Sequence, residues 1–383
     1  MADALKEHTG RIVEMNGQDV ADARKNGLSD AMVDRLVLDD GRISAMIQGL
    51  RDIASLPDPV SKVLKSWKKE NGLQLEKISV PIGVIGMIYE SRPNVTADAA
   101  ALCLKASNAI ILRGGSEALR SNLAIAGALL EGAKSAGLPD HVIQLVPMRD
   151  RDAVKALITM DQFVDVLIPR GGEGLIRAIA ENATVPVLKH YKGVCHVYVD
   201  GDADPHKAWS IVENAKCQRP GVCNAAETLL VDASLGTGWL LKMAEILQNL
   251  GVELRGDERS RQIVPSMNHA VEEDWHTEYL DMILSVKIVD GVKEAVDHIN
   301  TYGSGHSDAI VTENRENQQY FGRMVDAAAV YINASTRFTD GAEFGMGAEI
   351  GISTDRLHAR GPVALEELTT YKYVITGDGQ IKG

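Results

Sequence analysis

The chain has 383 residues, of which 45% are hydrophobic and 24% charged, and its formal net charge is −13. These proportions predict a globular protein with one large or two to three smaller domains. An acidic surface disfavours nucleic acid and anionic membranes as partners, because both are bound through clustered lysine and arginine. An anionic substrate would need local basic residues against this overall charge.

The four cysteines form no CxxC pair, which favours reduced thiols in a cytoplasmic protein. They are Cys103, Cys195, Cys217 and Cys223. The chain shows no secretory signal pattern and no apolar run of about 18 residues, so we expect a cytoplasmic location and no membrane partner. Histidine and acidic residues show no metal-ligand spacing, and no metal is expected.

The first 70 residues predict polar helices, at 1–18 and 29–54, followed by a break at Pro57 and Pro59. From Leu73 short apolar runs alternate with amphipathic stretches. The runs predict strands at 80–89, 109–113, 142–146, 163–169 and 185–188, and the stretches between them predict helices at 97–107, 116–136, 151–160 and 174–182.

The alternation resumes after Pro205, which predicts a second α/β lobe beginning near residues 193–205. Its expected strands are ETLLVD, ILSVKIVD, SDAIVTEN and AAVYINAS. Apolar strands between helices are typical of a parallel sheet covered on both faces, so we predict doubly wound lobes with ligands at the carboxyl ends of the strands. The last stretch, TTYKYVITGDGQIKG, alternates like a strand and could pair with LQLEKISV at 73–80. Such protruding strands commonly serve oligomerisation.

Two glycine-rich turns follow expected strands of the first lobe. One is Arg113-Gly114-Gly115-Ser116, and the other contains Gly171 and Gly172 after Arg170. Each opens a helix, where free backbone N–H groups and the helix dipole favour phosphate. Ordinary tight turns are the alternative, and neither turn is the GxGxxG pattern of a plain dinucleotide-binding fold.

Cys223 is the candidate nucleophile. It lies in a Pro-Gly turn directly before a strand, with Arg219 four residues earlier. A nearby cation and an exposed turn favour the reactive thiolate. Cys217 competes from the end of an expected helix, whereas Cys103 falls on an apolar helix face. Asn94, before another helix, is either a turn residue or an amide donor to an oxyanion.

Several segments resemble the aldehyde dehydrogenase superfamily, and within it the branch that reduces glutamyl phosphate. The most specific is VDGVKEAVDHINTYGSGHSDAI at 289–310. The segments at 81–118, around Cys223 and around Arg337 are similarly close. The resemblance covers nearly the whole chain, although members of that branch begin about one helix earlier. It implies an NADP-binding domain at 1–195, a catalytic domain at 196–365 and an oligomerisation tail at 366–383.

The resemblance also implies residue roles. Cys223 aligns with the superfamily nucleophile and Asn94 with the oxyanion-hole asparagine. Arg113 replaces a lysine that contacts the adenosine ribose, and Ser116 replaces a glutamate that holds the 2′-hydroxyl in NAD-preferring relatives. A serine there, beside Arg113, implies NADP. Glu278 aligns with the glutamate that binds the nicotinamide-side ribose.

The activity implied is reduction of L-glutamyl 5-phosphate by NADPH to L-glutamate 5-semialdehyde and phosphate, through a cysteine thioester, in proline biosynthesis. Arg92 and Arg219 are candidates for the substrate phosphate, and Arg337 is a candidate for the α-carboxylate. Surface or structural ion pairs remain the alternative for each arginine. The implied partners are a second copy of the chain, in a dimer or tetramer, and glutamate 5-kinase.

Two other interpretations stay open at this point. One is an aldehyde dehydrogenase that forms a free acid. It is disfavoured because His190-Tyr191-Lys192-Gly193 stands where such enzymes carry ELGG with its glutamate base. The other is a catalytically silent member kept as a binding protein, which loss of Cys223 or Asn94 would have favoured.

Overall fold

The computed structural model describes residues 1–382, which form two compact units. The first unit contains Met1–Lys189, Gly345–Ile352 and the C-terminal stretch from Pro362. The second contains His190–Phe344 and Ser353–Gly361. The domain boundaries expected from the sequence were at residues 195 and 365. In the structure the second unit begins at His190, and two later segments of the chain belong to the first unit again.

The stretches predicted as helical at 1–18 and 29–54 each form two helices, α1 (Ala2–Glu7) with α2 (Thr9–Lys25), and α3 (Asp30–Leu36) with α4 (Asp40–Ser55). Ser29 and Asp39 precede α3 and α4, and the side chain of each accepts a hydrogen bond from a backbone N–H of the first turn. Helix α2 packs on α6 (Leu119–Ser135), and α4 packs on α5 (Asn94–Lys105). Helices α2 and α4 therefore form a layer outside α5 and α6, and α5 and α6 contact the strands of the parallel sheet.

The sheet of the first unit has four parallel strands in the order β5-β4-β3-β6. They are β3 (Val84–Tyr89), β4 (Ala109–Arg113), β5 (Ile143–Leu145) and β6 (Val166–Arg170). The connections are α5, η1 (Ser116–Ala118) with α6, α7 (Asp152–Leu157), and α8 (Glu173–Asn182) after β6. The strand order reverses between β3 and β6, which makes a switch point where ligands of such sheets bind.

Two strand predictions in this unit were wrong. The run at 80–89 is not one strand, because β2 (Gln74–Pro81) ends before Gly83 and β3 begins at Val84. Gly83 has φ +135°, and a Cβ there would overlap the Asp165 carboxylate, which accepts a hydrogen bond from the Val84 N–H at 2.7 Å. The run at 185–188 forms only a single bridge, between Val187 and Leu167.

The sheet of the second unit has seven parallel strands in the order β10-β9-β11-β8-β7-β12-β13. They are β7 (Cys195–Val199), β8 (Ala226–Asp232), β9 (Glu253–Gly256), β10 (Asn268–His269), β11 (Ile283–Val289), β12 (Ser307–Val311) and β13 (Ala329–Ile332). The helical segments are α9 (Pro205–Cys217), η2 (Ala233–Leu235), α10 (Thr237–Asn249), α11 (Glu258–Ile263), α12 (Glu272–Trp275), α13 (Val292–Tyr302), α14 (Arg315–Met324) and η3 (Thr336–Phe338).

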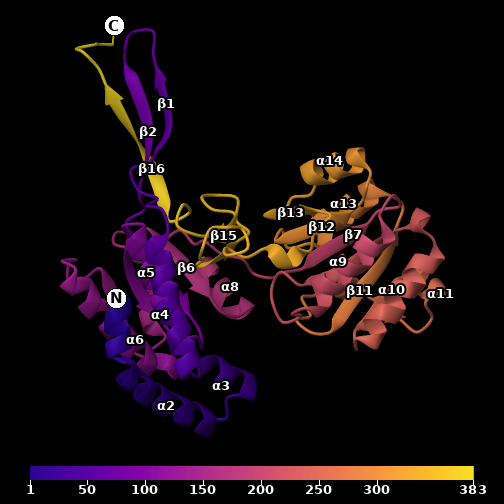
Figure 1. Ribbon diagram of the computed structural model, residues 1–383, viewed down its shortest axis with the longest axis horizontal. Helices are drawn as coiled ribbons and strands as arrows, with labels where there is room; N and C mark the ends of the chain where they lie inside the picture. Colours follow the sequence, from indigo (N-terminus) through magenta and orange to yellow (C-terminus); the bar gives the residue numbers. More distant parts are fainter. Residues whose placement is uncertain (383) are drawn as a thin grey trace. The chain divides into compact units, whose positions relative to one another are not determined.

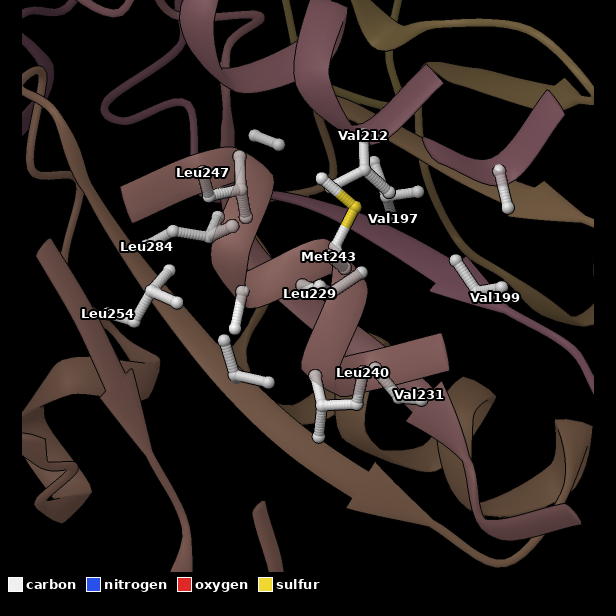
Figure 2. Close-up of a cluster of buried hydrophobic side chains, with 14 of the residues drawn as sticks. Val197, Val199, Val212, Leu229, Val231, Leu240, Met243, Leu247, Leu254 and Leu284 are labelled. Carbon is white, nitrogen blue, oxygen red and sulfur yellow. The ribbon is translucent and has the colours of Figure 1, made fainter. Parts of the chain in front are cut away.

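The core of the second unit lies between this sheet and the helices α9 and α10 (Figure 2). Met243 of α10 lies among Val212 of α9, Val197 of β7 and Leu229 of β8. All four side chains are at most 1% exposed. The continuous apolar runs of the sequence thus become strands that are buried on both faces, as a parallel sheet requires.

A third, antiparallel sheet belongs to the first unit and has the order β1-β2-β16. Strand β1 (Val63–Lys68) pairs with β2, and β2 pairs with β16 (Thr369–Thr376) from Thr370 opposite Val80 to Thr376 opposite Gln74. The expected pairing of the C-terminal stretch with residues 73–80 is confirmed. Figure 1 shows these strands extending away from the helices of the first unit. Strands β14 (Gly351–Ser353) and β15 (Gly361–Val363) form a separate pair.

Candidate active site

Cys223 lies in the loop between α9 and β8, residues 218–225, which we call the Cys223 loop. Its side chain is partly exposed, whereas Cys103 and Cys195 are completely buried and burial raises the pKa of both thiols. Cys217 is also partly exposed, but it packs on the core of the second unit and burial raises its pKa. Accessibility and loop position therefore favour Cys223 as the reactive thiol.

Two neighbours hold the backbone of Cys223 closely. A Cβ at Gly193 would overlap the Cys223 carbonyl, so only glycine fits there. The thiol of Cys195 donates to that carbonyl oxygen at 3.2 Å. The Gly193 N–H in turn donates to Oε1 of Glu278 at 2.8 Å, which connects the expected cofactor-ribose ligand to the segment beside Cys223. The sequence did not reveal this role of Gly193, because the contact joins distant parts of the chain.

A buried ion pair joins the two residues that flank the ends of the Cys223 loop. Nζ of Lys216, near the end of α9, lies 2.6 Å from Oε2 of Glu227, at the start of β8, and both side chains are 0% exposed. The Leu280 N–H donates to the other carboxylate oxygen at 3.1 Å. Burial raises the pKa of Glu227 to about 7, and the Lys216 charge opposes that shift. Sequence reasoning missed this pair, since nothing local marks a lysine and a glutamate as buried.

Arg337 and Arg219 place two positive charges near Cys223. Arg337 donates through Nε to Gln218 Oε1 at 2.9 Å and through Nη1 to the Asn224 side-chain oxygen, and both acceptors are neutral amides. Burial lowers the pKa of Arg337 and the charge of Arg219 lowers it further, while Cys223 acts in the opposite direction. Two cations that repel each other beside a thiol form an electrostatic site for an anion.

Asn94 and Arg92, the other expected catalytic and substrate residues, belong to the first unit. Asn94 is the first residue of α5, and its Nδ2 donates to Oδ2 of Asp98, one turn later, at 3.1 Å. Burial raises the pKa of Asp98 to about 6, while the Asn94 bond and the Arg170 charge oppose the shift. The bond fixes which way the Asn94 amide is turned, and its second N–H is left for another acceptor.

A cavity of about 1050 Å³ lies in the first unit, which we call the first-unit cavity. Residues that follow β3 and β4 line it, together with residues of α2, α7 and α8. Of the expected cofactor residues, Arg113, Gly115 and Ser116 line this cavity. The cavity therefore occupies the carboxyl ends of parallel strands, where such folds bind their ligands.

Of the other three turn glycines, Gly114 and Gly171 are closely packed. A Cβ at Gly114 would overlap the Asn122 amide and approach the Tyr89 ring, and one at Gly171 would approach the Glu90 carboxylate. The Gly172 N–H donates to Oε2 of Glu90 at 2.9 Å. The first-unit cavity suits a nucleotide, because it combines apolar walls such as Leu175 and Ile179 with arginines at its rim and a buried Nε of Arg113 that has no described partner.

Comparison with known proteins agrees with this architecture. Residues 34–281 match the model of the aldehyde dehydrogenase family. An acetylating aldehyde dehydrogenase of Geobacillus thermoglucosidasius has the same fold, with a TM-score of 0.66 at 18% identity over 100% of this chain and 91% of that one. The chain belongs to the aldehyde dehydrogenase family, whose members use a nicotinamide cofactor. The predicted fold class is thereby confirmed.

Nearer relatives define the branch. Gamma-glutamyl phosphate reductase of Thermoanaerobacter pseudethanolicus is 56% identical over 382 residues, which cover 100% of this chain and 92% of the relative. The crystal structure of the Thermotoga maritima gamma-glutamyl phosphate reductase has a TM-score of 0.98 at 50% identity, covering 100% of this chain and 92% of that one. Within its family, the chain belongs to the gamma-glutamyl phosphate reductases. The resemblance read from the sequence is confirmed.

Two further observations concern residues 1–382 as a whole. None of their helices is long and apolar enough to cross a membrane. Among the same residues, no group of three or more histidine, cysteine, aspartate and glutamate side chains is arranged to hold a metal ion.

Proposed function

We propose that the protein reduces L-glutamyl 5-phosphate with NADPH to L-glutamate 5-semialdehyde and phosphate, as a step of proline biosynthesis. The observation that carries the proposal is the position of Cys223, whose backbone packs against Gly193 and which lies near Arg219 and Arg337. The chain is 56% identical to a gamma-glutamyl phosphate reductase. The substrate has a phosphate and an α-carboxylate, and the two arginines offer the charges that match them.

Cys223 acts as the nucleophile. Its thiolate attacks the γ-acyl carbon, and the oxyanion accepts hydrogen bonds from the Asn94 amide and the Cys223 N–H. The carbon–oxygen bond to phosphate breaks, and phosphate leaves with the bonding electrons, which gives a thioester. When bound, the nicotinamide cofactor supplies the hydride that reduces the thioester carbon. The resulting thiohemiacetal loses the Cys223 thiolate as its carbon–oxygen double bond reforms, and the semialdehyde is released.

The arginines have separate tasks in this proposal. Arg219 and Arg92 hold the phosphate, and Arg337 binds the α-carboxylate. Arg337 is already oriented by Gln218 and Asn224, so little of its side-chain freedom is lost when the substrate binds. Water is a weak competitor for the thioester, because His190 stands where hydrolytic relatives carry a glutamate base.

NADPH is the proposed cofactor rather than NADH. Arg113 and Ser116 line the first-unit cavity. Glu117, next in the chain, also lines the cavity, but its Oε1 already accepts hydrogen bonds from the Ser91 N–H and hydroxyl at 2.8 and 2.6 Å. Glu278 holds the nicotinamide-side ribose, and Gly171 and Gly172 let the backbone approach the cofactor phosphates.

The antiparallel sheet of the first unit has hydrophobic side chains that a second copy of the chain could cover. The exposed strands β1 and β16 present hydrophobic side chains such as Val63 and Ile375, which are 55% and 57% exposed. We propose that this sheet supports a homodimer or homotetramer in the cytoplasm. Glutamate 5-kinase, whose product would be the unstable acyl phosphate, is a proposed partner.

The test follows absorbance of NADPH in the reverse direction, with pyrroline-5-carboxylate as the source of semialdehyde. NADPH should form only when NADP and phosphate are both present, and Cys223→Ala should form none. NADPH formation without phosphate would identify a hydrolytic dehydrogenase instead. Turnover by Cys223→Ala would exclude the thioester route. A Cys217→Ala variant is the matched control and should keep wild-type activity.

A further inference from the structure

The rim of the first-unit cavity carries more cations than the chain's acidic composition suggests. Nine charged side chains line it: the carboxylates Asp19, Asp22, Glu90 and Glu117, and the cations Arg113, Arg120, Arg149, Arg151 and Lys155. Their hydrogen bonds and ion pairs decide which charges remain for a ligand. A charge already paired inside the protein contributes little to binding, whereas an unpaired one attracts a counterion.

All four carboxylates are engaged. Asp19 and Asp22 both accept from Nη1 of Arg120, at 3.1 and 2.8 Å. Glu117 accepts from Ser91, and Glu90 accepts from the Gly172 N–H.

Lys155 is also paired, although its partner does not line the cavity: Nζ of Lys155 lies 2.7 Å from Oδ1 of Asp152. Two of the five cations, Arg120 and Lys155, are therefore neutralised by carboxylates.

Three arginines remain without a carboxylate partner among residues 1–382: Arg113, Arg149 and Arg151. Within the described part of the chain, Arg113 donates only to carbonyl oxygens, those of Gly114 at 3.1 Å, Arg149 at 3.3 Å and Asp150 at 3.5 Å, and its buried Nε has no partner there. Arg149 and Arg151 are exposed on the loop between β5 and α7. Because Arg113 holds the backbone of that loop, the three guanidinium groups belong to one structural unit at the cavity rim.

We propose that Arg149 and Arg151 join Arg113 in a subsite for the 2′-phosphate of NADPH, and that this loop determines the preference for NADPH over NADH. The inference rests on the proposed cofactor. The two nucleotides differ only in that phosphate, which carries a charge of about −1.5 to −2 at pH 7. Guanidinium groups bind phosphate through paired hydrogen bonds, and the Ser116 hydroxyl adds a neutral donor in the same cavity.

The test measures dissociation constants by calorimetry on the full chain, with NADPH, NADH and adenosine 2′-monophosphate as probes. Arg149→Ala and Arg151→Ala should each weaken NADPH and the monophosphate about tenfold, and the double variant about a hundredfold. NADH binding should change by less than about twofold. The salt dependence of NADPH binding should also become shallower with each arginine removed, because fewer charges meet the phosphate. Both arginines are exposed, so the variants should unfold at the wild-type temperature.

Lys155→Ala is the matched control, since it removes a rim cation that Asp152 already neutralises. Its affinity for NADPH should stay near that of the wild type, and an equal loss would show that only general charge matters and overturn the inference. Equal loss of NADPH and NADH, or an unchanged NADPH affinity in the double variant, would also overturn it. Equal binding of both nucleotides by the wild type would instead refute the proposed cofactor.

Discussion

The first-unit cavity and the Cys223 loop are built in opposite ways. The cavity is open, and three of its arginines have no carboxylate partner within residues 1–382. The loop is crowded, because Gly193 has no room for a Cβ and the buried pair of Lys216 and Glu227 closes its base. In the cavity, the negative charge that would pair with the arginines must come from a ligand. At the Cys223 loop, the protein supplies both charges of the buried pair itself. Substitutions should therefore alter affinity in the cavity and geometry or stability at the loop.

Breaking the buried pair should give the largest effect. Lys216→Met or Glu227→Gln alone leaves a buried group without its partner, which typically costs about 3–5 kcal/mol. The double variant Lys216→Met/Glu227→Leu should be much closer to wild type. Urea unfolding followed by tryptophan fluorescence reports on the second unit, which contains Trp209, Trp239 and Trp275. Single variants as stable as the wild type would mean that the pair does not support the loop.

The pH dependence of stability should show the same pair. The pKa of Glu227 is raised from 4.5 to about 7 in the folded protein, so the folded state holds a proton that the unfolded state has lost between these values. Stability from this group should be complete below about pH 4.5 and lost as pH rises through 7. The difference between wild type and Glu227→Gln, measured by urea unfolding at several pH values, should follow this slope. A pH-independent difference would contradict the assignment.

Gly193→Ala should move the nucleophile without unfolding the chain. The new methyl group must displace the Cys223 backbone, and a shift of about 1 Å in a catalytic group can cost about a hundredfold in rate. The turnover number and the alkylation rate of Cys223 are the measurements. Gly221→Ala is the matched control within the same loop, because its Cβ would meet only the Leu280 carbonyl at an ordinary 3.7 Å. Equal losses in both variants would remove the special role of Gly193.

Asp98→Ala should free the Asn94 amide and lower the turnover number about tenfold, with little change in KM, because an oxyanion donor acts mainly in the transition state. Asn94→Ala alone should cost about a hundredfold. A double variant no slower than Asn94→Ala would show that Asp98 acts through Asn94. Fully additive losses would assign Asp98 a separate function.

Ser116→Glu should have the smallest effect on the fold. The site lines an open cavity, so the free energy of unfolding should change by less than about 0.5 kcal/mol. A carboxylate there repels a phosphate and can accept a ribose hydroxyl, so the preference should shift toward NADH. Ser116→Gln has the same shape without the charge and should shift the preference less. Dissociation constants for both nucleotides decide between charge and shape.

Much of the fold could be predicted from the sequence, because apolar runs and turn residues report burial directly. Strand β4 has the predicted bounds, and the C-terminal stretch pairs with β2 as its alternation suggested. The break at Gly83 was missed, since a break between two strands inside an apolar run leaves the hydrophobic pattern intact. Cys223 could be proposed as the nucleophile because a turn, a cation and a family pattern coincide there.

The contacts around Cys223 could not be predicted in the same way. Gly193 and Cys223 are distant in sequence, and neither local pattern contains information about the other. Lys216 and Glu227 look like surface charges until α9 and β8 are brought together. Arg149 and Arg151 lie in a polar loop, and only their lack of carboxylate partners at the cavity rim distinguishes them from solvated arginines.

The pairing of β16 with β2 has a consequence for the order in which the chain folds during synthesis. Gln74 pairs with Thr376, so the antiparallel sheet of the first unit stays incomplete until Thr376 has left the ribosome. The main segment of the second unit, His190–Phe344, is continuous and emerges earlier. Closing contacts between distant residues is slow relative to local folding. The first unit, although it begins the sequence, therefore completes its folding after the second unit. Until β16 pairs with it, β2 exposes an unpaired edge.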